Sequence, residues 1–230
     1  RAIAARFALY AEDWDGALTA LNGSFLNLNA ASVADLKVGP QHVYAGGDDR
    51  NNPFYYVPNG SADRIIVGSP LWVSQAEAGD GRVDDKLDLR DAPAEVADLP
   101  LVSADWQEGR YGQIDPVPFI RNEELILIYA EAKINKGSAG ELAEAVIALN
   151  TIRTTWGLPV YSGAVTKAAL LNEMLNQRRY SLWGEGHRWV DMRRYGRLNQ
   201  IDTSLDGGRV VTQIARPQGE SDWEAYANGN

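Results

Sequence analysis

An apolar pattern at helical spacing between residues 119 and 196 constrains the fold more than any other feature of the chain. Four residues fall at i, i+3, i+4 and i+7 of one stripe: Leu125, Ile128, Tyr129 and Ala132. Such a stripe occupies one face of a helix. Gly137 follows it, and glycine adopts the left-handed conformation that commonly ends helices. The pattern therefore predicts an amphipathic helix that ends at Gly137.

Two more helices are predicted downstream. The first carries an equivalent stripe, made of Leu142, Ala145, Val146, Leu149 and Ile152. It should end at Trp156-Gly157-Leu158-Pro159, because glycine caps a helix and proline cannot continue one. The second should begin at Thr166, whose hydroxyl can cap the free amides, and stop near Gly184. Its apolar face is Leu171, Met174, Leu175 and Leu182. Helices joined by so few residues are expected to pack as antiparallel neighbours.

Residues 1–36 are predicted to form a helical hairpin of the tetratricopeptide kind. Two stripes flank a turn at Glu12-Asp13: Ala4, Phe7, Ala8 and Ala11, then Trp14, Ala17, Leu18 and Leu21. Small alanines allow two helices to approach closely, as in helical repeats. A repeat that cannot bury its own face needs neighbouring helices, so we expect this hairpin to pack against others.

Residues 37–118 have no helical period and are rich in glycine and proline. A β-hairpin is predicted from Phe54–Val57 and Arg64–Val67 around the turn-forming Pro58-Asn59-Gly60. Irregular segments of this length in a compact protein tend to be functional or disordered. Its aromatic residues favour an ordered, ligand-facing segment. Residues 119–198 are then the helical core, and residues 199–230 an extended tail in which Val210–Ile214 could form a short strand.

The charge pattern excludes several partners. The net charge of −9 argues against nucleic acid, which needs a lysine and arginine surface, and against anionic membranes. Residues 77–98 contain eight acids and three basic residues and so contribute −5 of that total. These acids could bind calcium, but the segment lacks the order of oxygen ligands found in EF-hands. A solvated acidic loop is therefore the preferred interpretation.

Catalytic motifs are missing from the sequence. It has no cysteine and only two histidines, His42 and His187, and it contains no metalloprotease, nucleophile-elbow or phosphate-loop pattern. Glu185 and Asp191 could form the carboxylate pair of a glycosidase. Nearby arginines, however, would lower the pKa of either carboxyl, and a general acid needs a raised one. His187 is assigned a structural role. We therefore predict no enzyme activity, no cofactor and no metal.

The segment from Glu185 to Gly196 mixes aromatic and charged residues. We expect a partly buried, hydrogen-bonded cluster of five side chains that ties the third helix to the hairpins: Glu185, Arg188, Trp189, Asp191 and Arg194. A guanidinium held under an aromatic surface needs a partner, because leaving it unpaired costs about 3–5 kcal/mol.

Several short stretches in series resemble the SusD-like (RagB/SusD) family. They are Arg121 with Glu124, Tyr129–Ala132, Asn150–Arg153, Trp156–Leu158 and Glu185–Gly196. The resemblance covers the C-terminal half of that family, whose members are about twice this long, so a missing N-terminal half is expected. The chain departs from the family at Gln177 and Ser181, where glutamates are usual, and at Gly184, where an aromatic residue is common. These departures put in doubt the family's ion pairs around Arg178 and Arg179.

The resemblance implies a mainly α, SusD-like fold, with tetratricopeptide-like helix pairs and a loop-rich insertion containing short strands. It implies a cell-surface, lipid-anchored outer-membrane protein of a Gram-negative bacterium, exported with a signal peptide. Its function would be nutrient uptake: non-catalytic binding of a glycan and delivery to a SusC-type TonB-dependent transporter. Two alternatives stay open: a peptide-binding importer protein, and a helical-repeat scaffold that binds only protein.

Carbohydrate sites need aromatic rings as platforms for the apolar faces of sugars. Four candidate platforms lie in residues 37–118: Tyr55, Trp72, Trp106 and Tyr111. We expect a site built from some of these rings. The alternative for each ring is that it is a buried core residue of this segment and does not contact a ligand.

Overall fold

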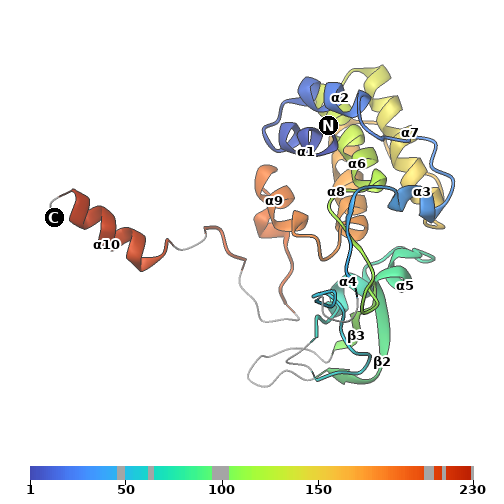
Figure 1. Cartoon of the computed structure of the whole chain (residues 1–230). Coiled ribbons are helices and arrows are strands. Elements are labelled where there is room, and N and C mark those ends of the chain that lie inside the picture. The colour runs from blue at the N-terminus through green and yellow to red at the C-terminus, as the bar shows by residue number, and fades with distance from the viewer. Residues whose placement is uncertain (46–49, 62–64, 95–103, 205–209, 214–215, 229–230) are drawn as a thin grey trace.

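The structure is a computed structural model, and it describes residues 1–45, 50–61, 65–94, 104–204, 210–213 and 216–228. Figure 1 shows two parts within these ranges. Residues 1–37 and 119–200 form a helical body. Residues 38–118 form a loop-rich part that lies against one end of the helices. This mainly α architecture with a loop-rich insertion confirms the predicted fold class.

The helices of the body are α1 (Ala2–Tyr10), α2 (Trp14–Asn22), α3 (Val33–Lys37), α6 (Asn122–Lys136), α7 (Ala139–Thr155), α8 (Lys167–Ser181), α9 (His187–Arg194) and the 3-10 helix η2 (Leu198–Gln200). The helix α6 is the centre of this body, because it contacts α1, α2, α3, α7 and α8. Its four consecutive residues 125–128 are fully buried, so the helix is enclosed on all sides rather than on one face. Such a helix joins two apolar clusters, one with α7 and α8 and one with α1 and α2.

The helix boundaries follow the predicted local signals. Gly137 ends α6 in the left-handed conformation, with φ of 79°. Thr166 caps α8 by accepting a hydrogen bond from the Ala169 amide. Ser138 and Glu141 form a capping box that begins α7. The structure confirms the three predicted helices, the end of α6 at Gly137 and the start of α8 at Thr166.

The α1/α2 hairpin is present, but its first predicted stripe is wrong. Asp13 caps α2 as expected after the turn. In α1, however, the buried residues are Ala2, Ala5 and Leu9, and Phe7 is 68% exposed. The two readings of α1 differ by a rotation about the helix axis. The α1 face that meets α6 includes Arg6, whose guanidinium reaches Glu124 at 2.6 Å, and this contact fixes the rotation.

The loop-rich part contains the short helices α4 (Pro70–Ser74) and α5 (Arg82–Lys86) and the strands β1 (Gln41–His42), β2 (Leu87–Ala94), β3 (Ala104–Glu108) and β4 (Val117–Pro118). Strand β2 pairs antiparallel with β3, and β1 pairs with β4. The hairpin predicted from residues 54–67 is wrong for its described residues. The Asn59 amide donates to the Gln107 side chain, and Val67 bridges Gln107, so this segment lies along β3. Arg64 lies outside the described residues.

The acidic segment is fastened to the helical body by ion pairs. Two of its acids pair with cations of the helical body, Glu77 with Arg153 and Asp85 with Lys37, and Asp80 pairs with Arg82 of the segment itself, all at 2.6–2.8 Å. Asp84 and Asp88 are exposed, while Glu95 and Asp98 lie outside the described residues. The interpretation as a merely solvated loop is therefore wrong for half of the described acids.

Arg82 reaches α8 at the two positions, Gln177 and Ser181, where the sequence departs from the resembled family. This fully buried guanidinium pairs with Asp80 and also donates to the Ser181 hydroxyl at 3.0 Å and the Gln177 carbonyl at 3.3 Å. A glutamate at 181 would be a second acid beside Asp80. The neutral Ser181 instead leaves room for an arginine from the loop-rich part to reach the end of α8.

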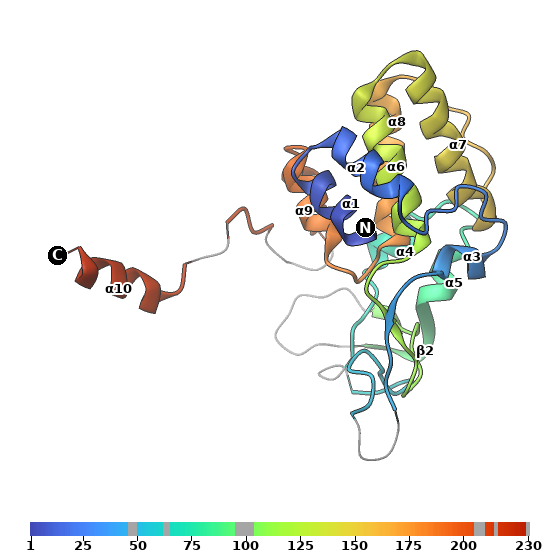
Figure 2. The same ribbon diagram turned by 45° about the horizontal axis from the view of Figure 1, so that its top comes forward.

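The C-terminal segment differs from the extended tail that the sequence suggested. Residues Gln218–Ala227 form a helix, α10, which lies apart from the body in both Figure 1 and Figure 2. Gln218 donates to Asp222, four residues further along α10, and side-chain pairs at this spacing stabilise a helix. The described residues 210–213 are not a strand, and Ile214 lies outside the described ranges. No helix in those ranges has the length and apolar run needed to cross a bilayer.

Candidate functional site

A cleft opens where the helical body meets the loop-rich part. Its first hollow, of about 340 Å³, is lined by rings, by charged groups and by backbone turns: Arg6, Phe54, Arg110, Tyr111, Val117, Pro118, Phe119, Gly184, Glu185 and His187. Phe119 is 56% exposed and Phe54 is 38% exposed, so both rings are open to a ligand. The Phe54 and Tyr111 rings lie 6.1 Å apart.

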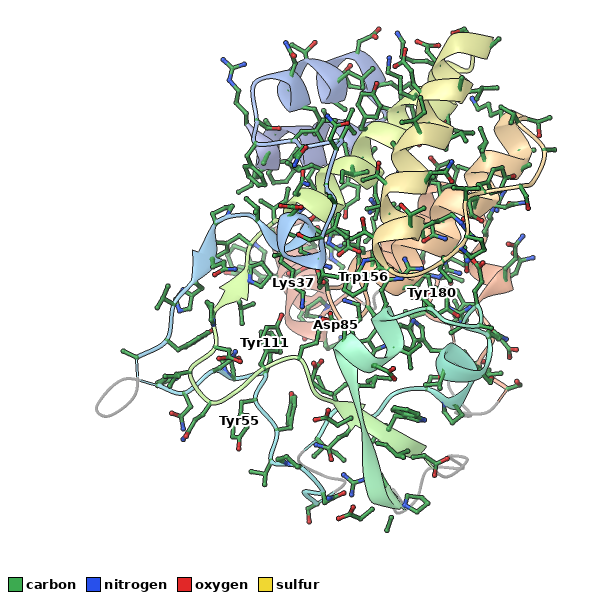
Figure 3. The ribbon with its side chains drawn as sticks, turned by 90° about the vertical axis from the view of Figure 1, so that its right-hand side faces the viewer. Lys37, Tyr55, Asp85, Tyr111, Trp156 and Tyr180 are labelled. Carbon is green, nitrogen blue, oxygen red and sulfur yellow. The ribbon has the colours of Figure 1, made fainter. Side chains whose placement is uncertain are left out.

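A second hollow of about 220 Å³ adjoins the first and shares Arg110, Tyr111, Pro118 and Glu185 with it. We call the two together the Tyr111 cleft. Figure 3 shows Tyr111 near the level at which the helices end, with the paired Lys37 and Asp85 beside the same junction. The shared residues place Tyr111 at the boundary of both hollows, where a ligand in either one meets its ring.

Arg110 holds Tyr111 in position. Its guanidinium lies 5.1 Å from the Tyr111 ring centre and donates to Glu108 at 2.7 and 2.6 Å and to the Trp183 carbonyl at 2.8 Å. Burial alone would lower the pKa of Arg110, but the hydrogen bonds to Glu108 raise it. Arg110 is therefore a fixed cation that links β3 to the segment after α8.

The second hollow contains a buried cation that has no hydrogen bond to a carboxylate within the described residues. Lys86 is 3% exposed, and burial together with the charge of Arg121 lowers its pKa to about 8. Arg121 itself is held by Glu123 at 3.1 Å and Glu185 at 2.6 Å. The floor of the cleft thus combines acids and bases that can bind hydroxyl groups.

His187 closes the other end of the first hollow. Its Nδ1 and the Tyr10 hydroxyl are 2.5 Å apart, and burial lowers the pKa of the imidazole. The ring is therefore neutral at neutral pH and joins α9 to α1. This contact agrees with the structural role expected for His187.

The four predicted platforms occupy different environments. Tyr111 lines both hollows. Tyr55 is half-buried in the lower loop of Figure 3 and lines neither hollow. Trp106 is also half-buried and packs against the aromatic cluster of Trp72 and Tyr180. Only Tyr111 among the four therefore meets the cleft.

Trp72 requires a correction. It is only 4% exposed, its ring lies 4.9 Å from that of Tyr180, and its indole nitrogen donates to the Arg179 carbonyl at 3.2 Å. The flanking Pro70 starts a helix, α4, that turns the ring inward. Trp72 is thus mainly a core residue of the loop-rich part, although it also lines a hollow of about 210 Å³ with Trp183 and Trp189.

Sequence reasoning did not identify Phe54, Phe119 or Arg6 as cleft residues. Phe54 was assigned to a strand that does not form, and Phe119 was treated as the start of a helix. The sequence did carry a signal for Phe119, because this residue stands at the boundary between the irregular segment 37–118 and the predicted helical core 119–198. Arg6 carried no signal, since its place depends on a contact with Glu124, 118 residues away.

The expected cluster after Glu185 divides into separate groups. Asp191 and Arg194 meet in the core with two further residues: Arg178 donates to Asp191 at 2.7 Å, and Arg194 donates to Glu131 at 2.8 Å. Burial alone would raise the pKa of Asp191, but Arg178 and Arg194 hold it below its ordinary value. These contacts join α6, α8 and α9.

The other three members lie elsewhere. Glu185 pairs with Arg121 at the cleft. Arg188 donates to the Leu175 carbonyl at 3.2 Å, and Trp189 donates to the Val211 carbonyl at 2.6 Å. The prediction of a single cluster is therefore wrong, because Glu185 precedes α9 and neighbouring residues of this helix point in different directions around its axis. Across the described ranges, no group of three acids or histidines converges as a metal site.

Comparison with solved structures shows the same fold in longer proteins. A SusD superfamily protein from Bacteroides vulgatus matches with a TM-score of 0.61 and 20% identity, over 85% of this chain and 51% of that one. Surface glycan-binding protein A from Bacteroides thetaiotaomicron matches with a TM-score of 0.62 and 16% identity, over 97% and 60%. A SusD-like carbohydrate binding protein from Bacteroides vulgatus gives 0.55 and 21%, over 83% and 43%. The chain spans about half the length of the first of these proteins.

Sequence comparison gives the family directly. A search of curated proteins found no match. The sequence pattern of the SusD family, in contrast, matches residues 102–228, which are more than half of the chain. The match covers the helices α6 to α10 and the buried contacts among α6, α8 and α9. The chain belongs to the SusD family.

Proposed function

We propose that the protein binds a glycan in the Tyr111 cleft without acting on it chemically. The observation that carries this proposal is the convergence of three open or half-open rings, Phe54, Tyr111 and Phe119, with fixed charged groups in one hollow. Two solved structures of the same fold are named for glycan or carbohydrate binding. Those names concern other proteins and support the proposal only through the shared fold.

The physical argument concerns the two kinds of surface that a sugar presents. Its C–H faces are apolar and pack on aromatic rings, and its hydroxyls need donors and acceptors. The cleft supplies rings from three segments, with Arg6, Arg110 and Glu185 beside them. Small-molecule sites commonly combine apolar walls with a few fixed polar groups in this way.

The wider role is proposed from the family. The glycan would be captured at the extracellular face of the outer membrane and delivered to a SusC-type TonB-dependent transporter, with the protein held by a lipid anchor. The division into a helical hairpin, a ligand-side region at residues 37–118, a helical core and a tail fits this role. The cleft borders the ligand-side region, as the proposal requires.

The test is titration of a glycan panel against Tyr111→Ala, Tyr111→Phe and Phe54→Ala variants, with folding checked by circular dichroism. Loss of a platform ring should cost about 1–3 kcal/mol, or about 5- to 150-fold in affinity. Tyr111→Phe keeps the ring and should retain most of the affinity. The matched control is Tyr226→Ala, because that exposed ring lies on α10 apart from the cleft. Unchanged glycan affinity in both alanine variants would move the site away from the cleft.

A further inference from the structure

A separate hollow, apart from the two that form the Tyr111 cleft, lies on another side of the helical body between α8, α9 and η2. Its volume is about 520 Å³, and it is lined by two arginines, three side-chain amides and two apolar residues: Asn172, Leu175, Asn176, Arg188, Met192, Arg197 and Gln200. We call it the α8–α9 hollow. Its size falls within the range of about 300–1,000 Å³ that is usual for small-molecule sites. It shares no lining residue with the Tyr111 cleft.

The arginines of this hollow lack carboxylate partners among the described residues. Arg188 donates once, to the Leu175 carbonyl, and Arg197 donates once, to the Asn172 side chain at 2.6 Å. A guanidinium carries five N–H groups, so most donors of both residues are left for a ligand. Every buried arginine of the core, by contrast, meets a described acid: Arg82, Arg121, Arg153 and Arg178.

The charge of Asp191 offsets part of this positive potential. Asp191 is the acid of α9, but Arg178 and Arg194 already bind its two oxygens. Burial and the nearby charge of Arg179 lower the pKa of Arg188 to about 10, and Arg197 acts in the same direction. Two arginines therefore line one hollow in a chain whose net charge is −9.

We propose that the α8–α9 hollow binds an acidic sugar, whose carboxylate is held by Arg188 and Arg197. Paired guanidinium donors suit a planar carboxylate, which they can bind through two parallel hydrogen bonds. Asn172, Asn176 and Gln200 supply the amide donors and acceptors that sugar hydroxyls require. This combination distinguishes a sugar acid from a bare anion, which would use only the arginines.

The proposal does not rest on glycan binding in the Tyr111 cleft. Arg188 also lines a neighbouring hollow of about 210 Å³ that contains Trp183 and Trp189. An aromatic wall next to the arginine gives a longer acidic oligosaccharide a place for its next ring. Tyr111→Ala should therefore leave binding in the α8–α9 hollow intact, and failure of either proposal leaves the other open to test.

The experiment is an NMR titration of the full chain with galacturonic acid, galactose and acetate, followed through the amide signals of α8 and α9. Galacturonic acid should shift these signals and bind about tenfold more tightly than either galactose or acetate, since each comparator lacks one of the two recognised features. Higher salt should weaken the binding, because the attraction is between charges. Equal affinity for galactose, or for acetate, would overturn the proposal.

Variants localise the effect. Arg188→Gln and Arg197→Gln should each weaken galacturonic acid binding about tenfold. Arg193→Gln is the matched control, because it removes the same charge from an exposed position of α9 that does not line the hollow. Arg197 is only half-buried, so its variant tests the site even if Arg188→Gln unfolds. Binding unchanged in Arg197→Gln, or weakened equally in Arg193→Gln, would contradict the assignment.

Discussion

The helical body and the loop-rich part are each stabilised by a different kind of interaction. In the helical body, aliphatic side chains from α6, α7 and α8 form an apolar core, with Leu127, Leu149 and Leu170 among its fully buried members. The loop-rich part has a small cluster of Trp72, Leu87 and Tyr180, of which Tyr180 belongs to α8. Ion pairs provide much of its attachment to the helices. Packing that is spread over many residues tolerates local change better than a few buried charges, each of which needs its own partner.

The largest effect is expected where one buried arginine fastens the two parts. Arg82→Met should leave the Asp80 carboxylate buried without its partner and cost about 3–5 kcal/mol. Arg216→Met is the control, because its pairs with Glu220 and Glu224 are exposed. Chemical denaturation gives the stability change, and hydrogen exchange should show the loss first in residues 65–94. Equal destabilisation of α6 amides would mean that the two parts do not differ in this respect.

A somewhat smaller effect is expected inside the helical body. Leu149→Ala should destabilise the protein by about 3 kcal/mol, because the cavity lies in a closely packed core. Ile147→Ala on the same helix removes a side chain that is 64% exposed and should change little. Thermal and urea unfolding of both variants test the contrast. If the two variants melt alike, α7 does not pack as described.

A third test uses the buried cation of the cleft floor. Lys86 has a pKa of about 8 in the folded protein and 10.5 as its ordinary value. Between these values the unfolded chain binds more protons, so the contribution of Lys86 to stability rises as pH rises. Lys86→Met should therefore be more stable than the parent near neutral pH, and this advantage should shrink by about 2 kcal/mol toward about pH 10.

The readout is urea unfolding of parent and variant at a series of pH values. Lys167→Met is the control, since that lysine is exposed at the start of α8. A difference between Lys86→Met and the parent that stays constant with pH would show that Lys86 is not desolvated in the folded state.

The smallest effects concern two glycines near the turn between α6 and α7. Gly137 has φ of 79°, so Gly137→Ala should cost about 1 kcal/mol. Gly140 lies inside α7, and a methyl group there would meet no atom within 4 Å. Gly140→Ala should therefore stabilise the helix by up to about 1 kcal/mol. Opposite shifts in melting temperature would confirm the local geometry, and shifts of the same sign would contradict it.

The helical body could be predicted from the sequence better than the loop-rich part. Helix periods and caps are local signals, so α6, α7 and α8 and the ends at Gly137 and Thr166 were predicted. The hairpin of residues 54–67 was not a valid inference, because Gln107 binds that segment from a distant strand. The partners of Arg82 and Arg178 were likewise not predictable from spacing.

The lining of the proposed cleft was predicted only in part for the same reason. Tyr111 was chosen because an aromatic residue next to Arg110 stood in an irregular stretch; it lines the cleft, and its part in binding stays a prediction. Trp72 was indistinguishable from it in sequence, yet α4 turns its ring into the core. Phe54 and Phe119 meet across a junction between two parts of the chain, and no local pattern describes such a meeting.

The enclosed position of α6 has a consequence for the rate of folding. This helix can form its own backbone hydrogen bonds locally, but its buried Glu124 and Glu131 accept hydrogen bonds from arginines 118 and 63 residues away, and Glu131 also accepts one from the Tyr195 hydroxyl. Contacts between such distant segments slow the search for the native state, because long loops must close before the contacts are gained. We therefore expect the docking of α1 and α9 onto α6 to be a late step of folding.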